Sequence, residues 1–161
     1  MTETLARRIT RLKEDYDLQP CGKKHAVSLD ELSAKSSRFS KEVTLGDCVI
    51  DFENSKLSVV QGGVIPIVAD FAGVYLARMY ADNLGNHGIT PLAGLKEAYF
   101  KPFILGVDKR IVARAMISEV NNFRIFVIVF VENEKGDTKG QAKLSFALRF
   151  RKAYPPYPLA S

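Results

Sequence analysis

Residues 61–77 constrain the fold more than any other part of the chain, because this segment is almost continuously apolar and carries one charged side chain, Asp70. The apolar run is shorter than the ~18 residues that a membrane-spanning helix needs, and it contains Pro66. We therefore expect a buried helix over about residues 64–83, at the centre of a soluble protein. Gly62-Gly63 breaks the chain before this helix, and Pro66 is compatible with its first turn, where backbone N–H groups have no intrahelical partner.

Asp70 requires a specific explanation, because removing an ionised carboxylate from water is costly unless a partner compensates it. A buried Asp is therefore either satisfied by a neighbour or kept for chemistry. Tyr75, Tyr99 or a backbone N–H are the candidate neighbours. We favour chemistry and expect Asp70 to be a catalytic residue.

The composition is that of a soluble globular protein. The chain has 161 residues, 47% hydrophobic and 25% charged, which is enough for one domain with a substantial core. A net charge of +5 favours anionic partners without choosing among them. Cys21 and Cys48 are too few for a metal cluster and are expected to be free thiols. The first residues lack the apolar core of a signal peptide, so we expect a cytoplasmic protein.

Two helices are predicted before the main body of the fold. Apolar residues recur at helical spacing from Leu5 to Tyr16, which indicates an amphipathic helix that ends at Gln19-Pro20-Cys21-Gly22. A capping box at residues 28–31 predicts a second, short helix that ends near residue 37. His25 lies between the two in a basic linker and is expected to be solvated.

Strands are predicted on both sides of the central helix. One precedes it, over residues 42–52, and four follow it, over residues 92–100, 109–119, 123–131 and 141–151. The strand at 123–131 is apolar on both faces, which places it inside the sheet. The last strand has one apolar face and one polar face that carries Lys143, Arg149 and Arg151. Residues 153–161 are expected to form a flexible tail.

This order of elements resembles the hotdog fold, an α+β architecture in which a curved antiparallel sheet wraps around one long helix. Gln61-Gly62-Gly63 followed by Asp70 resembles the His-Gly-Gly…Asp pattern of acyl-CoA thioesterases of the phenylacetyl-CoA thioesterase type. The small residue Gly73 and the strand end at residues 97–102 add to this resemblance. It implies one hotdog domain, with an N-terminal helical extension at residues 1–41, a hotdog core at residues 42–152 and the tail.

The resemblance also implies a function, the hydrolysis of an acyl-CoA to a free acid and coenzyme A with neither metal nor cofactor. The substrate could equally be carried by an acyl carrier protein. Asp70 would act as general base or nucleophile, Gly62 and Gly63 would hold the oxyanion, and Gln61 would orient the thioester. In related dimers this acid faces the glycine turn of the other subunit, so we expect a homodimer or a pair of dimers.

Two departures from the family pattern leave a second function open. Gln61 stands where the family has His, and an amide does not transfer protons as an imidazole does. The family's upstream polar residue has no match at its usual offset, although Asn54 lies one position away. A hotdog protein that binds an acyl group or acyl-CoA without cleaving it is therefore the alternative. Arg149 and Arg151 are candidates to contact the phosphates of coenzyme A, although a solvated face is the simpler interpretation.

A third candidate, a hotdog enoyl-CoA hydratase, rests on the five-residue offset between Asp82 and His87. These residues fall at the exit of the central helix, whereas the hydratase pair precedes it. Nucleic-acid binding is disfavoured because aromatic and basic residues do not alternate along a strand face.

Overall fold

The computed structural model describes residues 3–50, 58–84 and 92–148. The predictions made for Asn54, His87, Arg149, Arg151 and the tail at 153–161 lie outside these residues.

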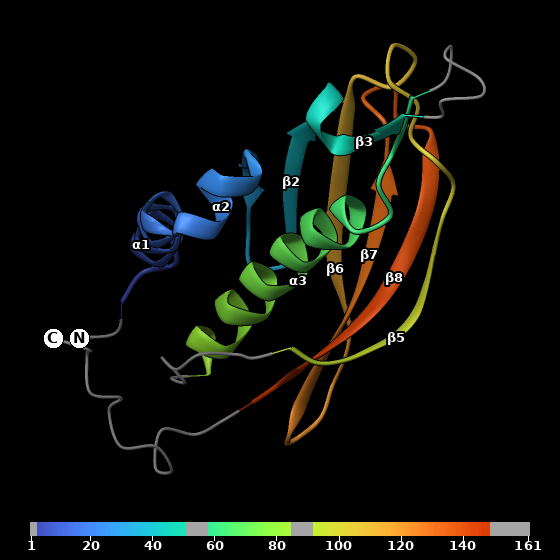
Figure 1. The fold of residues 1–161 in the computed structure, drawn as a ribbon. Helices are drawn as coiled ribbons and strands as arrows, with labels where there is room; N and C mark the ends of the chain where they lie inside the picture. The colour runs from blue at the N-terminus through green and yellow to red at the C-terminus, as the bar shows by residue number, and fades with distance from the viewer. Residues whose placement is uncertain (1–2, 51–57, 85–91, 149–161) are drawn as a thin grey trace, which may run out of the picture.

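A six-stranded antiparallel sheet curves around the long helix α3, Val64–Asn83, as Figure 1 shows. The strands run in the order β1 (Val27–Leu32), β2 (Ser36–Glu42), β6 (Arg110–Val120), β7 (Arg124–Glu132), β8 (Thr138–Ala147) and β5 (Leu92–Phe100). Two short strands, β3 (Cys48–Ile50) and β4 (Ser58–Val60), pair with each other near the start of α3. The α+β architecture of the hotdog fold is confirmed, and β7 lies inside the sheet as predicted.

Helix α3 is the core helix that its apolar sequence predicts. Side chains such as Val68, Ala72 and Leu76 are fully buried. The helix is long and apolar enough to cross a membrane by composition, but most of it is covered by the rest of the fold. Gly73 lies close to side chains of β8, since a Cβ there would stand 2.7 Å from Leu144 Cδ1 and 2.9 Å from Phe146 Cζ.

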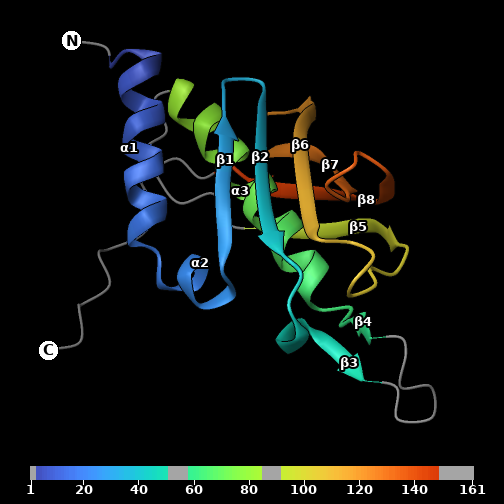
Figure 2. The ribbon, with the colours of Figure 1, turned by 90° about the horizontal axis from the view of Figure 1, so that it is seen from above.

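Two N-terminal helices, α1 (Leu5–Leu18) and α2 (Pro20–His25), lie beside β1 and α3 (Figure 2). The predicted first helix is confirmed as α1. Its amphipathic character is explained by Leu12 and Tyr16, which are buried against the core. Arg11 binds Asp82 near the end of α3 at 2.6 Å, so an ion pair with a buried partner fixes α1 to the central helix.

The predicted second helix over residues 28–37 is wrong, because these residues form β1 and the start of β2. The capping signal is local and contributes only about 1 kcal/mol. Strand pairing instead joins β2 to both β1 and β6 and buries Phe39 in the core. Ser37 also donates a hydrogen bond to the Ala72 carbonyl of α3 at 2.6 Å. The helical extension therefore ends at His25, and residues 27–42 belong to the sheet.

The predicted strand over residues 42–52 is wrong over residues 43–47 and confirmed over residues 48–50, and residues 51–52 lie outside the described part of the chain. The chain leaves β2 at Glu42, makes a single 3-10 turn at Leu45–Asp47, and re-enters a strand only at Cys48–Ile50. Thr44 and Asp47 cap this turn reciprocally, and the Asp47 carboxylate accepts from the Thr44 N–H at 3.0 Å. The predicted strand at 92–100 is confirmed to the residue as β5, and β6 and β7 each begin one residue later than predicted.

We predict that Gly73→Val lowers the free energy of unfolding by about 1–3 kcal/mol, because the added atoms force α3 away from Leu144 and Phe146. Urea unfolding followed by circular dichroism measures this change. Gly46→Ala is the matched control, since its Cβ would meet only Thr44 Oγ1, at 3.8 Å. Equal losses in both variants would show that the close approach of α3 to β8 does not matter for stability.

Candidate active site

Asp70 stands on the first half of α3 as a half-buried carboxylate. Its Oδ1 atom is buried and has no hydrogen-bond partner in the described part of the chain. Neither tyrosine considered as a satisfying neighbour donates to it. Burial raises the pKa of Asp70 above its ordinary value, because the charged form loses solvation and gains no compensating contact.

The Asp70 side chain lines a cavity of about 380 Å³ whose walls come from α2, α3, β5 and β8. Most of the lining is apolar and includes Phe71, Leu95, Phe100 and Leu144. A carboxylate in such surroundings is a stronger base than one in water. The cavity therefore combines room for an apolar group with a base prepared to accept a proton.

Gly62 and Gly63 form an exposed turn between β4 and α3, and backbone hydrogen bonds hold the segment that leads into it. The Val60 N–H donates to Phe103 O at 3.0 Å, and the Gln61 N–H donates to Asp47 O at 2.8 Å. The turn leads into the N-terminus of α3, where unpaired N–H groups and the helix dipole favour negative charge.

The two glycines are not required by the fold of one subunit. A Cβ added at Gly62 or Gly63 would meet nothing within 4 Å. Gly63 also has an ordinary right-handed φ of −76°. The absence of side chains therefore leaves open space beside the turn.

A buried ion pair supports this turn from behind. Lys41 Nζ lies 3.0 Å from Asp47 Oδ2, and both side chains are largely buried. Burial alone would raise the pKa of Asp47, but hydrogen bonds from Thr44 and Lys41 hold it below its ordinary value. Because the Asp47 carbonyl accepts from Gln61, this ion pair helps to fix the position of the glycine turn.

One subunit does not bring Asp70 and Gly62 together. Asp70 follows Val64, the first residue of α3, by six residues, which corresponds to about 9 Å along the helix. An oxyanion donor must lie within about 3 Å of the carbonyl oxygen, so this rise is long for the turn and Asp70 of the same chain to serve one carbonyl group. Gln61 is exposed at the turn and does not line the Asp70 cavity either.

Two further predicted residues lie away from the cavity. Lys143 alternates along β8 with Ala142 and Leu144, which line the cavity, so its side chain is on the opposite face of the sheet. Asp82, proposed for a hydratase, is buried and engaged with Arg11. Its carboxylate therefore anchors α1.

His25 is the cavity residue that the sequence analysis missed. It was expected to be solvated, but it is half-buried on α2 and lines the Asp70 cavity together with Cys21. Pro20 is the available signal in the sequence, because proline is frequent at the first position of a helix and would have predicted α2.

No protein-family model and no curated protein matches the sequence. Solved structures do share its fold. The E. coli PaaI protein from the phenylacetic acid degradation operon has a TM-score of 0.72 at 14% identity, covering 89% of this chain and 95% of that chain. A variant of the phenylacetic acid degradation protein PaaI from Thermus thermophilus has a TM-score of 0.63 at 19% identity, covering 80% of this chain and 98% of that one.

A variant of a thioesterase enzyme from Staphylococcus aureus is a third such structure. Its TM-score is 0.64 at 16% identity, and the match covers 80% of this chain and 98% of that chain. At these identities the likeness establishes the hotdog fold.

We predict that Asp70→Asn stabilises the protein at neutral pH, because it removes a buried charge that lacks a partner. The pKa of Asp70 is raised in the folded state, so its contribution to stability is complete below the ordinary value of 3.8 and is lost as pH rises through the raised value. Thermal unfolding midpoints measured between pH 4 and pH 8 should therefore converge at low pH. The Asn variant should have the higher midpoint at neutral pH, and a lower midpoint there would show that the carboxylate is satisfied.

Proposed function

We propose that this protein is a thioesterase that hydrolyses an acyl-CoA, or the equivalent acyl carrier thioester, to a free acid and a thiol. The observation that carries the proposal is the buried Asp70 oxygen without a hydrogen-bond partner in an apolar cavity. A glycine turn at a helix N-terminus supplies the second feature that thioester hydrolysis needs, and the hotdog fold is shared with a thioesterase from Staphylococcus aureus.

The mechanism assigns one role to each feature. Asp70 accepts a proton from a water molecule as the water oxygen attacks the thioester carbonyl carbon. The Gly62 N–H, at the positive end of α3, donates to the oxyanion that forms, and Gly63 leaves room for the acyl group to approach. The tetrahedral intermediate then collapses, the carbon–sulfur bond breaks, and the departing thiolate takes the proton from Asp70. Gln61 orients the thioester, and no step needs a metal or a cofactor.

A second copy of the chain completes this site. The rise of about 9 Å from the start of α3 to Asp70 favours a glycine turn that comes from a partner. Strand β5 offers the edge for such a pairing, because it ends the sheet and exposes Leu95 and Tyr99. The opposite edge strand, β1, lies beside α1 and α2 (Figure 2).

We predict that Asp70→Asn lowers kcat/KM for acyl-CoA hydrolysis by about 10²–10⁴-fold, because the variant has no base to accept the proton. Thiol release from a panel of short, long and aromatic acyl-CoAs measures the loss. Asp17→Asn is the control, since Asp17 is exposed on α1 and outside the Asp70 cavity.

The same measurement separates the two functions left open by Gln61. Hydrolysis that persists unchanged in Asp70→Asn would contradict the assignment of Asp70 as the base. Binding of acyl-CoA by the unaltered protein, measured by calorimetry, with no thiol release from any substrate would instead assign an acyl-CoA binding protein.

We predict that two inactive variants restore activity to each other when they share a dimer. Asp70→Asn keeps an intact glycine turn, and Gly62→Val keeps the base while its side chain, which meets no neighbour in its own subunit, blocks the turn. One of the two sites in a mixed dimer then has both functional halves. Co-refolding equal amounts should recover about a quarter of the unaltered activity, because half of the dimers are mixed. No recovery from verified mixed dimers would place both groups in one subunit.

A further inference from the structure

Helix α2 contributes two side chains to the wall of the Asp70 cavity. Cys21 and His25 are four residues apart, so they lie on one face of this helix, and both line the cavity. On α3, Phe71 and Val74 line the same cavity. Helix α2 stands on one side of α3 and β5 on the other (Figure 1, Figure 2), so the cavity crosses the surface of α3 between two walls.

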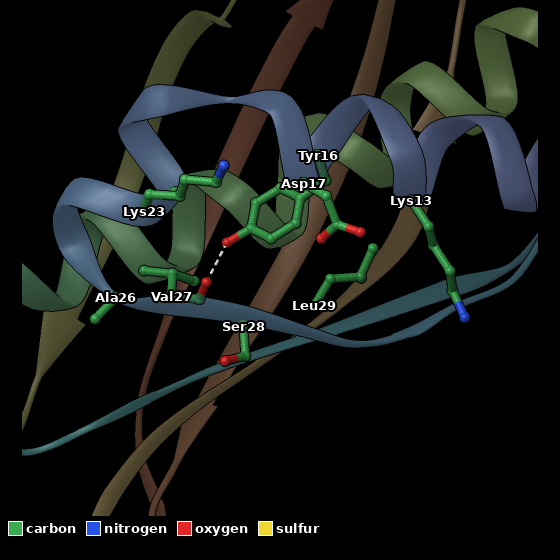
Figure 3. Close-up of a pocket in the computed structure, with 9 residues that line it drawn as sticks. Lys13, Tyr16, Asp17, Lys23, Ala26, Val27, Ser28 and Leu29 are labelled. Atoms are coloured by element: carbon green, nitrogen blue, oxygen red, sulfur yellow. Dashed lines mark hydrogen bonds between the residues drawn. The ribbon is translucent and has the colours of Figure 1, made fainter.

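The position of α2 is fixed by contacts on its other face. Gly22 packs against Tyr16 so closely that a Cβ would stand 2.9 Å from the ring. The Tyr16 hydroxyl donates a hydrogen bond to the Val27 carbonyl, as Figure 3 shows. Ala26, which ends α2, has a left-handed φ of 50°, a conformation that costs a non-glycine residue free energy. These contacts hold α2 as a preformed wall.

Tyr16 also connects this wall to the central helix. Its ring makes edge-to-face contacts with Phe71, at 5.6 Å between centroids, and with Phe39 and Tyr75, both at 5.3 Å. Phe71 itself lines the cavity. One buried aromatic cluster therefore sets the distance between α2 and the cavity side of α3.

We propose that α2 is the end wall of the acyl pocket and that Cys21 and His25 set the length of the acyl group that the protein accepts. This inference rests on the proposed function, in which the thioester carbonyl lies beside Asp70. The acyl group is apolar and extends from there into the apolar cavity, where Cys21 and His25 of α2 line the space. A cavity of about 380 Å³ holds roughly a dozen groups the size of a water molecule, at ~30 Å³ each. The substrate class is therefore short- and medium-chain or single-ring acyl groups.

The first test measures kcat/KM over a series of straight-chain acyl-CoAs for variants that change the wall in opposite directions. Cys21→Ala and His25→Ala enlarge the pocket and should favour longer chains, by about fourfold for each methylene that gains a buried place. Cys21→Phe should lower hydrolysis of the longest accepted chain by roughly tenfold or more and leave the shortest unchanged. Lys24→Ala, on the same helix but not among the cavity residues, is the control.

The direction of the change distinguishes a wall from a merely structural helix. A disturbed fold lowers the hydrolysis of every chain length to the same extent. If the enlarging and the reducing variants both behave in this way, the inference is overturned. A length profile that does not move in any variant, while hydrolysis persists, would also overturn it and would leave the proposed function intact.

The second test does not depend on turnover. Cys21 is exposed and Cys48 is buried, so N-ethylmaleimide should alkylate Cys21 first, as followed by mass spectrometry of the intact protein. A medium-chain acyl-CoA thioether, which is not hydrolysed, should slow this alkylation at least tenfold. S-methyl-coenzyme A, which has no free thiol to consume the reagent and no acyl group, should not. Protection of Cys21 without hydrolysis of any thioester would support α2 as the wall of an acyl pocket and would contradict the proposed thioesterase activity. An alkylation rate of Cys21 that is the same with and without saturating thioether would overturn the inference that α2 lines the acyl pocket.

Discussion

The contact between α3 and the concave face of the sheet is the interaction on which the rest of the molecule depends. Helix α3 is apolar around nearly its whole circumference, so the sheet covers only part of the surface that must leave water. On the sheet side, Gly73 allows a close approach to Leu144 and Phe146 of β8. The aromatic cluster around Tyr16 covers another side. What these two sides leave uncovered becomes the cavity that holds Asp70.

Stability and the proposed chemistry oppose each other at Asp70. The surrounding core tolerates a carboxylate oxygen without a hydrogen-bond partner, although the same helix position would be more stable with a neutral side chain. Burial that destabilises the ionised group also makes it a better base. A residue kept only for structure would be expected to have a partner, as Asp47 has in Lys41 and Asp82 has in Arg11.

Elements with a clear hydrophobic pattern and local breakers could be predicted from the sequence, among them the long apolar helix and β5. The segment 28–37 was predicted as a helix because a capping box is visible in four residues. Its strand β1 is instead specified by pairing with β2, which in turn pairs with the distant strand β6, and no local signal shows this. Asp70 and the glycine turn could be found by spacing. His25 could not, since the fold alone brings α2 to the cavity.

The glycine turn is supported within its own chain, and in the proposed dimer it acts beside Asp70 of the other copy. Neither glycine is needed by its own chain, yet the hydrogen bond from Gln61 to Asp47 and the buried pair with Lys41 hold the turn firmly. In the proposed dimer the turn acts on a carbonyl beside the other copy's Asp70, so no substrate contact within its own subunit positions it. Its geometry would then be set before the two copies meet, and support from η1, Leu45–Asp47, provides this.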